Sequence, residues 1–203
     1  MTEKDTVHYR QIFHAKNVAY LPPFIGWDHP HCQEGIGTFC LYHGNLSVKE
    51  NEKVATWLLQ EVFVDLEIPF VIAGKDPAAK LEKLAHWKNH TCLVSNPTEK
   101  EMYDLIQKAQ INIIPSFTDS GIKIKFLYSV FCGRHCLVNE TMTLGTPLGP
   151  ACHIANGATA FKSILVQLFR KPFEEEEIRL RENLLHHHYN NQQTARRLIQ
   201  WLW

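Results

Sequence analysis

The sequence has no excess of charge of either sign and no long apolar run. Lysine and arginine together number 21, and so do aspartate and glutamate, among 203 residues. Domains that bind nucleic acid usually carry a basic excess, so general nucleic-acid binding is not expected. No apolar run reaches the roughly 18 residues that a membrane-spanning helix needs. The first ten residues are polar and lack the apolar stretch of a secretion signal, so we expect a cytoplasmic protein.

Cysteine pairs and metal-ligand patterns are also scarce. The six cysteines are too few for a disulfide scaffold, and several stand inside apolar runs, where a thiol acts as a small hydrophobic side chain. The twelve histidines include local groups at residues 29–32, 86–92 and 186–188. The first group has no matching second cluster, the second is close only in sequence, and three consecutive histidines on a helix cannot face one ion. We therefore expect no bound metal and no other cofactor.

From residue 38 onward, short apolar runs alternate with amphipathic stretches. The runs predict strands at residues 38–44, 69–74, 91–95, 111–116, 135–139 and 152–155. Apolar residues at helical spacing predict helices at 51–63, 78–86, 98–109, 121–131, 157–169, 174–186 and 192–203. Strands that are apolar throughout and alternate with helices are typical of a parallel sheet covered on both faces. The sequence therefore predicts a doubly wound α/β domain.

Ligands of a doubly wound sheet bind at the carboxyl ends of its strands, so the segments after the strands are the candidate site. Glycines and lysines follow three of them: Gly44 with Lys49, then Lys75, then Gly121 with Lys123 and Lys125. Gly121 opens a predicted helix whose free amides suit a phosphate, and the two lysines after it fall near its first turn. On spacing alone, each segment is better explained as an ordinary connection with solvated lysines, and only their convergence on one sheet edge favours a site. The P-loop and G-x-G-x-x-G patterns are absent.

Six segments between residues 20 and 203 carry a more specific pattern. They are YLPPF, LYHGNLSVKENEKVATWLL, IPFVIAGK, NPTEKEMYDLIQKAQINIIPSF, SGIKIKFLYSVFCGRHCLVN and LIQWLW. In this order they resemble the C-terminal half of family 4 glycosyltransferases with the GT-B fold, and are most similar to a subgroup from Bacteroidetes. The resemblance implies a Rossmann-like domain that binds a nucleotide-diphosphate sugar. The reaction it implies is a metal-independent hexosyl transfer, with retention, to a glycan or lipid-linked acceptor.

In that family, the preceding half of the enzyme binds the acceptor. Residues 1–37, whose stretch 20–32 holds three prolines, are then interpreted as a connector and a remnant of an acceptor domain that this chain lacks. Residues 38–203 form the nucleotide-sugar-binding domain with its C-terminal helices. The resemblance thus implies a role in polysaccharide biosynthesis, with a full-length enzyme that is cytoplasmic and peripheral to the inner membrane. The isolated chain is expected to be inactive, and no catalytic residue is assigned.

The resemblance transfers only in part to individual residues. The family's two donor-binding glutamates fall on Ser120 and Tyr128, and its phosphate-binding arginine and lysine fall on Asn45 and Asn51. The turn of Gly121 and Ile122 matches the place where backbone amides meet the diphosphate. The candidate donor-binding residues are Gly44, Asn45, Lys49, Lys75, Ser120, Gly121, Ile122, Lys123, Lys125 and Tyr128. The lysines are candidate replacements for the lost cations, and we expect Lys123 to contact the diphosphate.

Two hypotheses about function and two about the C-terminus stay open. The four departures from the family pattern favour a non-catalytic assembly or regulatory module, whereas the glycines and lysines at the strand ends favour a donor-binding domain. The last helix repeats apolar residues at helical spacing, at Ala195, Leu198, Ile199 and Leu202, beside Trp201 and Trp203. This face either forms a homo-oligomer through the terminal helix and the connector or packs on its own domain.

Overall fold

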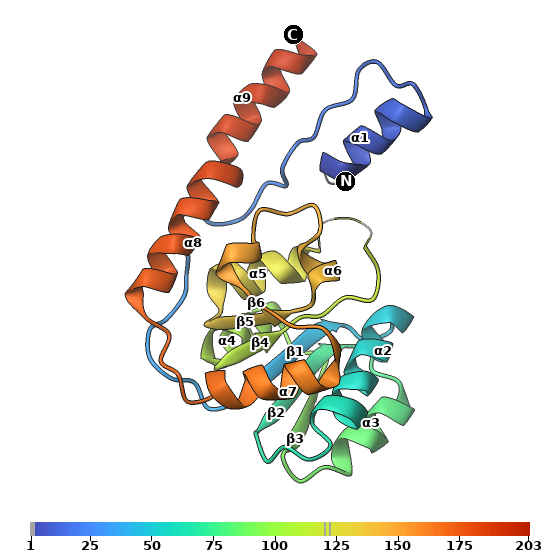
Figure 1. Cartoon of the computed structure of the whole chain (residues 1–203), viewed down its shortest axis with the longest axis vertical. Coiled ribbons are helices and arrows are strands. Elements are labelled where there is room, and N and C mark those ends of the chain that lie inside the picture. The colour runs from blue at the N-terminus through green and yellow to red at the C-terminus, as the bar shows by residue number, and fades with distance from the viewer. Residues whose placement is uncertain (1–2, 120, 122) are drawn as a thin grey trace.

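A computed structural model describes residues 3–119, 121 and 123–203, and within this part of the chain six strands form one parallel sheet (Figure 1). The strands are β1 (Cys40–Asn45), β2 (Phe70–Lys75), β3 (Thr91–Ser95), β4 (Ile111–Ile113), β5 (His135–Val138) and β6 (His153–Ile154). Their order is β3-β2-β1-β4-β5-β6, and every adjacent pair is parallel. The order reverses between β1 and β4, where doubly wound sheets bind ligands. The structure confirms the predicted α/β fold.

Helices cover both faces of the sheet. They are α1 (Glu3–Ile12), α2 (Lys49–Trp57), α3 (Ala79–His86), α4 (Glu99–Lys108), α5 (Ile124–Cys132), α6 (Glu140–Thr143), α7 (Gly157–Leu168), α8 (Glu175–His188) and α9 (Asn191–Leu202). Helix α2 continues into a π-helical turn over Leu58–Val62, and a short 3-10 turn spans Gly149–Ala151. Helices α2, α3 and α7 pack on one face, and α4, α5 and α8 pack on the other.

Side-chain alternation explains why the strands are apolar throughout. In β1, Cys40 and Tyr42 pack with the α2 and α7 layer, whereas Leu41 packs with the α4 layer. All three side chains are fully buried because each face of the sheet has its own helical cover. Helix α4 begins with a capping box, in which the Thr98 hydroxyl accepts from the Glu101 amide at 3.2 Å and the Glu101 carboxylate accepts from the Thr98 amide at 2.8 Å.

Helix α5 begins three residues later than the sequence predicts. Gly121 has a left-handed φ of +67°, which a right-handed helix cannot include. Lys123 is the extended N-cap residue of the helix, and its ammonium donates to the Thr118 carbonyl at 3.0 Å. Lys125 therefore occupies the first turn that the sequence assigned to Lys123. Helices α1 and α6 were also not predicted, because α1 is mostly exposed and α6 has only four residues.

The C-terminal helices are tied to the sheet domain by a buried arginine. Arg181 of α8 is 2% exposed, and its guanidinium donates to the Gly133 carbonyl at 2.6 Å and to the Arg134 carbonyl. These carbonyls follow the C-terminus of α5, where a cation is favoured. The connector is held in turn by Asn191, whose amide group bonds the backbone N–H and C=O of Ile25 at 3.1 and 2.7 Å.

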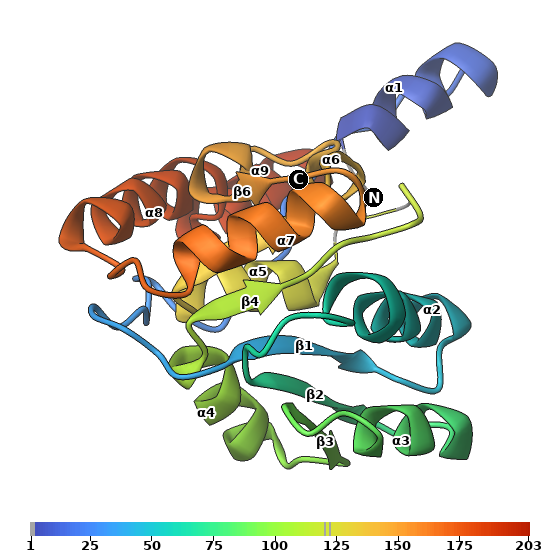
Figure 2. The same cartoon turned by 60° about the horizontal axis from the view of Figure 1, so that its bottom comes forward.

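Two helices extend beyond this body. Helix α1 projects away from the sheet, and α9 carries the C-terminus (Figures 1 and 2). On α9, Ile199 is 58% exposed and Leu202 is 69% exposed, so part of its apolar face has no cover within the described chain. Every helix among the described residues is too short or too polar to cross a membrane.

Candidate functional site

A pocket of about 670 Å³ opens at the carboxyl edge of β1 and β2. It lies next to the point where the strand order reverses, which is the expected position for a ligand of this fold. Strand ends, the N-terminal half of α4 and the first turns of α5 form its walls. The described lining residues are His43, Gly44, Asn45, Gly74, Lys75, Pro97, Glu99, Lys100, Met102, Tyr103, Ile106, Ile124, Lys125 and Tyr128.

The floor of the pocket depends on two paired glycines. Gly44 and Gly74 stand opposite each other in the register of β1 and β2. A Cβ atom on Gly74 would lie 1.9 Å from the Gly44 carbonyl oxygen and 2.8 Å from Cγ of Leu46. The strands therefore need a glycine at position 74 to approach this closely. A Cβ on Gly44 would lie 3.4 Å from Nζ of Lys125, so the backbone of β1 is directly accessible to that ammonium group.

Lys125 is the cation closest to this floor. Its ammonium donates to Oδ1 of Asn51 at 2.7 Å and lies 5.0 Å from the centroid of the Tyr42 ring. Burial, with a smaller contribution from the charge of Lys123, lowers the pKa of Lys125 to about 8. Among the described residues, no carboxylate forms an ion pair with Lys125. A desolvated cation without an anionic partner is costly to the folded chain and fits a site that receives an anion.

His43 contributes no charge to the pocket. Its Nε2 lies 2.9 Å from Oγ of Ser129, which itself donates to the Lys125 carbonyl at 3.0 Å. The hydroxyl proton of Ser129 is engaged in that bond to the carbonyl, so in the other pair Nε2 of His43 donates to Oγ of Ser129. Burial, together with the charge of Lys125, lowers the pKa of His43 to about 3, and the ring is neutral near pH 7.

Apart from the neutral His43, the ionisable side chains that line the pocket are mostly cationic. Three lysines and one glutamate line it: Lys75, Lys100, Lys125 and Glu99. Helix α5 adds to this charge, because no side chain of the described residues caps its N-terminus and its first two residues line the pocket. Free amides at a helix N-terminus attract anions, and a nearby lysine strengthens that attraction. The N-terminus of α4, by contrast, is already capped by its own side chains.

The structure brings together half of the residues that the sequence singled out. Those that line the pocket are Gly44, Asn45, Lys75, Lys125 and Tyr128. Lys49, Gly121 and Lys123 are not among the described lining residues. Ser120 and Ile122 lie outside the described part of the chain. The binding roles of all ten residues stay predictions.

The two asparagines at the family's cation positions have structural contacts. Oδ1 of Asn45 accepts hydrogen bonds from the amide and hydroxyl of Ser47, at 3.1 and 2.7 Å, and shapes the turn after β1. Nδ2 of Asn51 donates to the Asn45 carbonyl at 2.8 Å, while its Oδ1 accepts from Lys125. Asn51 therefore connects the end of β1 to the ammonium group of Lys125. The positive charge at this end of the pocket is thus carried by a residue of α5 and not by one of α2.

The α4 wall of the pocket was not predicted. Met102, Tyr103 and Ile106 form an apolar side, and Ile106 is buried. The segment after β3 is one of the strand-end segments that the sequence analysis considered, but residues two turns into α4 carry no local sign of a site. The connector supports the pocket from two sides, since His31 hydrogen-bonds the Tyr103 hydroxyl of α4 and Trp27 packs edge-on against Tyr128 of α5 with ring centroids 4.7 Å apart.

Comparison with known proteins agrees with this architecture. The family model described as glycosyl transferases group 1 matches residues 37–169. A solved variant of S. aureus TarM, in complex with fondaparinux, alpha-GlcNAc-glycerol and UDP, is 11% identical with a TM-score of 0.71, over 99% of this chain and 42% of that one. The GtfA/B complex is 12% identical with a TM-score of 0.68, over 98% of this chain and 42% of that one.

A UDP-forming α,α-trehalose-phosphate synthase from Burkholderia xenovorans is 9% identical with a TM-score of 0.60, over 81% of this chain and 43% of that one. The chain thus spans less than half the length of these three proteins. Among curated proteins, none matches the sequence significantly. Identities this low establish the fold alone, whereas the family match spans all six strands of the sheet. The chain belongs to the group 1 glycosyltransferases, and its Rossmann-like sheet corresponds to the C-terminal domain of the GT-B fold.

Proposed function

We propose that this domain binds the nucleotide-diphosphate sugar that donates a hexosyl group in a retaining transfer reaction. The observation that carries the proposal is Lys125 at the N-terminus of α5, a desolvated cation that has no carboxylate partner among the described residues. The pocket that it faces is large enough for a nucleotide, since ligand pockets usually span about 300–1,000 Å³. Its apolar side, with Met102, Ile106 and Tyr128, suits the flat faces of a base or sugar.

The chemistry of sugar transfer explains why cations would gather here. When the bond between the sugar and the diphosphate breaks, negative charge develops on the leaving diphosphate. Preorganised donors that face this charge lower the barrier most when water is excluded. In our proposal, Lys125 and the free amides of α5 meet this charge directly, and Lys75 and Lys100 add to the field at the rim.

The position of Asn51 supports the same assignment. The family resemblance implies a cation at this position, and the chain has an amide instead. Its Oδ1 accepts from Lys125 at 2.7 Å and holds that ammonium above the end of β1. The chain thus lacks the cation that the resemblance implies at position 51, and Lys125 of α5 supplies a positive charge beside it. The acceptor, a glycan or lipid-linked sugar, would bind to a second domain, and turnover requires both domains in one geometry.

Calorimetric titration with UDP, GDP and uridine tests the proposal. UDP comes first because two of the similar structures are named with it. We expect UDP or GDP to bind and uridine, which lacks the diphosphate, to bind at least tenfold more weakly. Lys123→Ala tests the sequence-based expectation that this residue also contacts the diphosphate, and unchanged affinity would remove it from the site. An absence of diphosphate binding at millimolar concentration would overturn the proposal and favour a non-catalytic module.

A further inference from the structure

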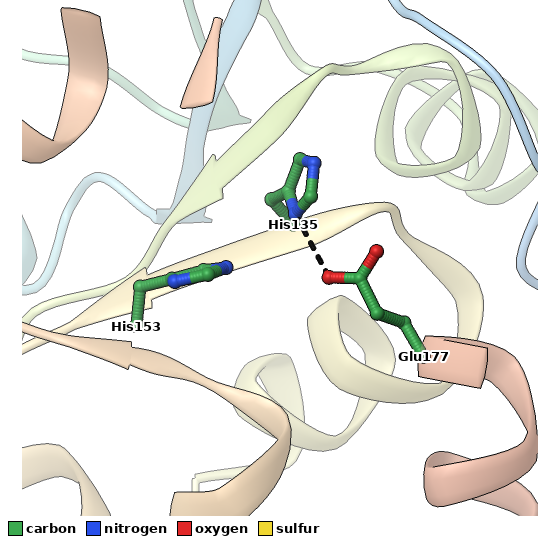
Figure 3. A group of neighbouring side chains, drawn as sticks. All are labelled: His135, His153 and Glu177. Atoms are coloured by element: carbon green, nitrogen blue, oxygen red, sulfur yellow. Dashed lines mark ion pairs between the residues drawn. The ribbon is translucent and has the colours of Figure 1, made fainter. Parts of the chain in front are cut away.

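Three side chains with metal-ligand chemistry converge at the edge of the sheet opposite the pocket. His135 is the first residue of β5, His153 is the first residue of β6, and Glu177 lies in the first turn of α8 (Figure 3). One potential ligand atom from each residue lies within 4.8 Å of the other two. His153 pairs with Leu137 across the two strands, so side-chain alternation places both histidines on one face of the sheet.

The hydrogen bonds of His135 leave one ring nitrogen without a proton. Its side chain is fully buried, and Nε2 lies 3.0 Å from the Lys171 carbonyl oxygen. A carbonyl only accepts, so Nε2 carries the proton and, in a neutral ring, Nδ1 carries a lone pair.

This lone pair faces a carboxylate. Nδ1 has no hydrogen-bond partner within the described chain, and it lies 3.4 Å from Oε1 of Glu177. Two electron-rich atoms at this distance, one of them buried, repel each other unless a proton or a cation lies between them. The second oxygen of Glu177 accepts from the Glu174 amide at 3.0 Å, which holds the carboxylate in this orientation.

We propose that His135, His153 and Glu177 bind a divalent transition-metal ion, of which Zn²⁺ fits the ligand set best. Two imidazoles and one carboxylate are established zinc ligands, and imidazole suits the later first-row metals in general. The hydrogen bond from His135 to the Lys171 carbonyl is the arrangement that commonly orients a metal-bound histidine.

The distances require only a local adjustment. Ligand atoms around a tetrahedral zinc ion lie roughly 3.3 Å apart, given metal–ligand bonds of about 2.0 Å. The separation of 3.4 Å between His135 and Glu177 already satisfies this, and His153 must move inward by at most about 1.5 Å from the 4.8 Å limit. A hollow of about 60 Å³ beside His153 and Glu177 has room for a water molecule in the fourth position.

The role that follows is structural. The ion would join β5, β6 and the start of α8, and so fix the direction in which the C-terminal helices leave the sheet. The site is independent of the proposed donor pocket, because parallel strands that end at the pocket begin at the opposite edge. Metal binding and diphosphate binding can therefore fail or succeed separately.

Titration of the chelator-treated full chain with Zn²⁺ and Co²⁺ tests the proposal. We expect one bound ion, ligand-field absorption typical of tetrahedral Co²⁺ with nitrogen and oxygen ligands, and a higher melting temperature with Zn²⁺. His153→Ala and Glu177→Gln should each weaken binding at least tenfold and remove the thermal shift. His187→Ala is the matched control, because His187 is an exposed residue of α8 that hydrogen-bonds the Asn183 carbonyl.

A variant of the fully buried His135 is not used, since it tests folding as much as binding. Failure of both ions to bind at millimolar concentration would overturn the proposal. Binding that survives in both His153→Ala and Glu177→Gln would also overturn it, because the ion would then be held by surface histidines. Loss of Zn²⁺ binding in these variants with unchanged UDP affinity would support the site and its independence from the pocket.

Discussion

Replacing Lys125 with methionine should stabilise the free protein and weaken its binding to a diphosphate. Burial lowers the pKa of Lys125 from 10.5 to about 8. Each pKa unit corresponds to about 1.4 kcal/mol, so keeping the buried ammonium charged at pH 7 costs about 3 kcal/mol. Methionine has similar length and no charge, but it loses the charge-assisted hydrogen bond to Asn51, worth about 1.5–3 kcal/mol. We expect a net gain of about 1 kcal/mol in the free energy of unfolding at pH 7.

The sign of the pH dependence follows from the same shift. Between about pH 8 and 10.5 the unfolded chain binds more protons at Lys125 than the folded chain does, so this residue makes stability rise with pH across that window. Methionine should remove this rise. Chemical denaturation below pH 8 and above it measures both effects, with Lys80→Met as the control because Lys80 is exposed on α3.

Diphosphate affinity should change in the opposite direction. A charge-assisted hydrogen bond contributes about 1.5–3 kcal/mol, so Lys125→Met should weaken UDP binding roughly ten- to a hundredfold. In the unmodified protein, affinity should fall as pH rises above about 8, because the free site loses its cation while the phosphate is already fully ionised. A variant that is less stable than the original and binds UDP equally well would refute the reasoning, since Lys125 would then be a structural residue.

Three further predictions concern the floor of the pocket, the anchor of α8 and the terminal helix. Gly74→Ala should unfold the chain or lower its melting temperature strongly, because the added Cβ meets the Gly44 carbonyl at 1.9 Å; a melting temperature near that of the original would contradict this. Arg181→Met should destabilise the chain by about 3 kcal/mol in urea denaturation, because it leaves the buried carbonyls of Gly133 and Arg134 unpaired, and a loss below about 1 kcal/mol would count against the anchor. Light scattering should show self-association that disappears when residues 192–203 are removed, because Ile199 and Leu202 are exposed; a monomer in both cases would rule it out.

Local patterns in the sequence determined most of the secondary structure and the class of the fold. Buried parallel strands must be apolar on both faces, so their runs stand out without any knowledge of the tertiary structure. The Thr98–Glu101 capping box lies within four residues, so its pattern is contained in the local sequence. One helix boundary was predicted wrongly, because local patterns did not show that Gly121 takes a left-handed conformation. Helix α5 therefore begins at Ile124 and not at residue 121.

The sites were decided by packing between distant segments. Lys125 and Asn51 are 74 residues apart, and only the stacking of α5 beside the end of β1 makes the lysine a desolvated cation held by an amide. Glu177 belongs to an acidic run at the start of α8, which the sequence alone explains as helix stabilisation, yet its carboxylate also faces His135 on β5. Periodicity and capping report on neighbours within a few residues. Desolvation and convergence depend on which surfaces the folded chain brings together, and only the tertiary structure shows those.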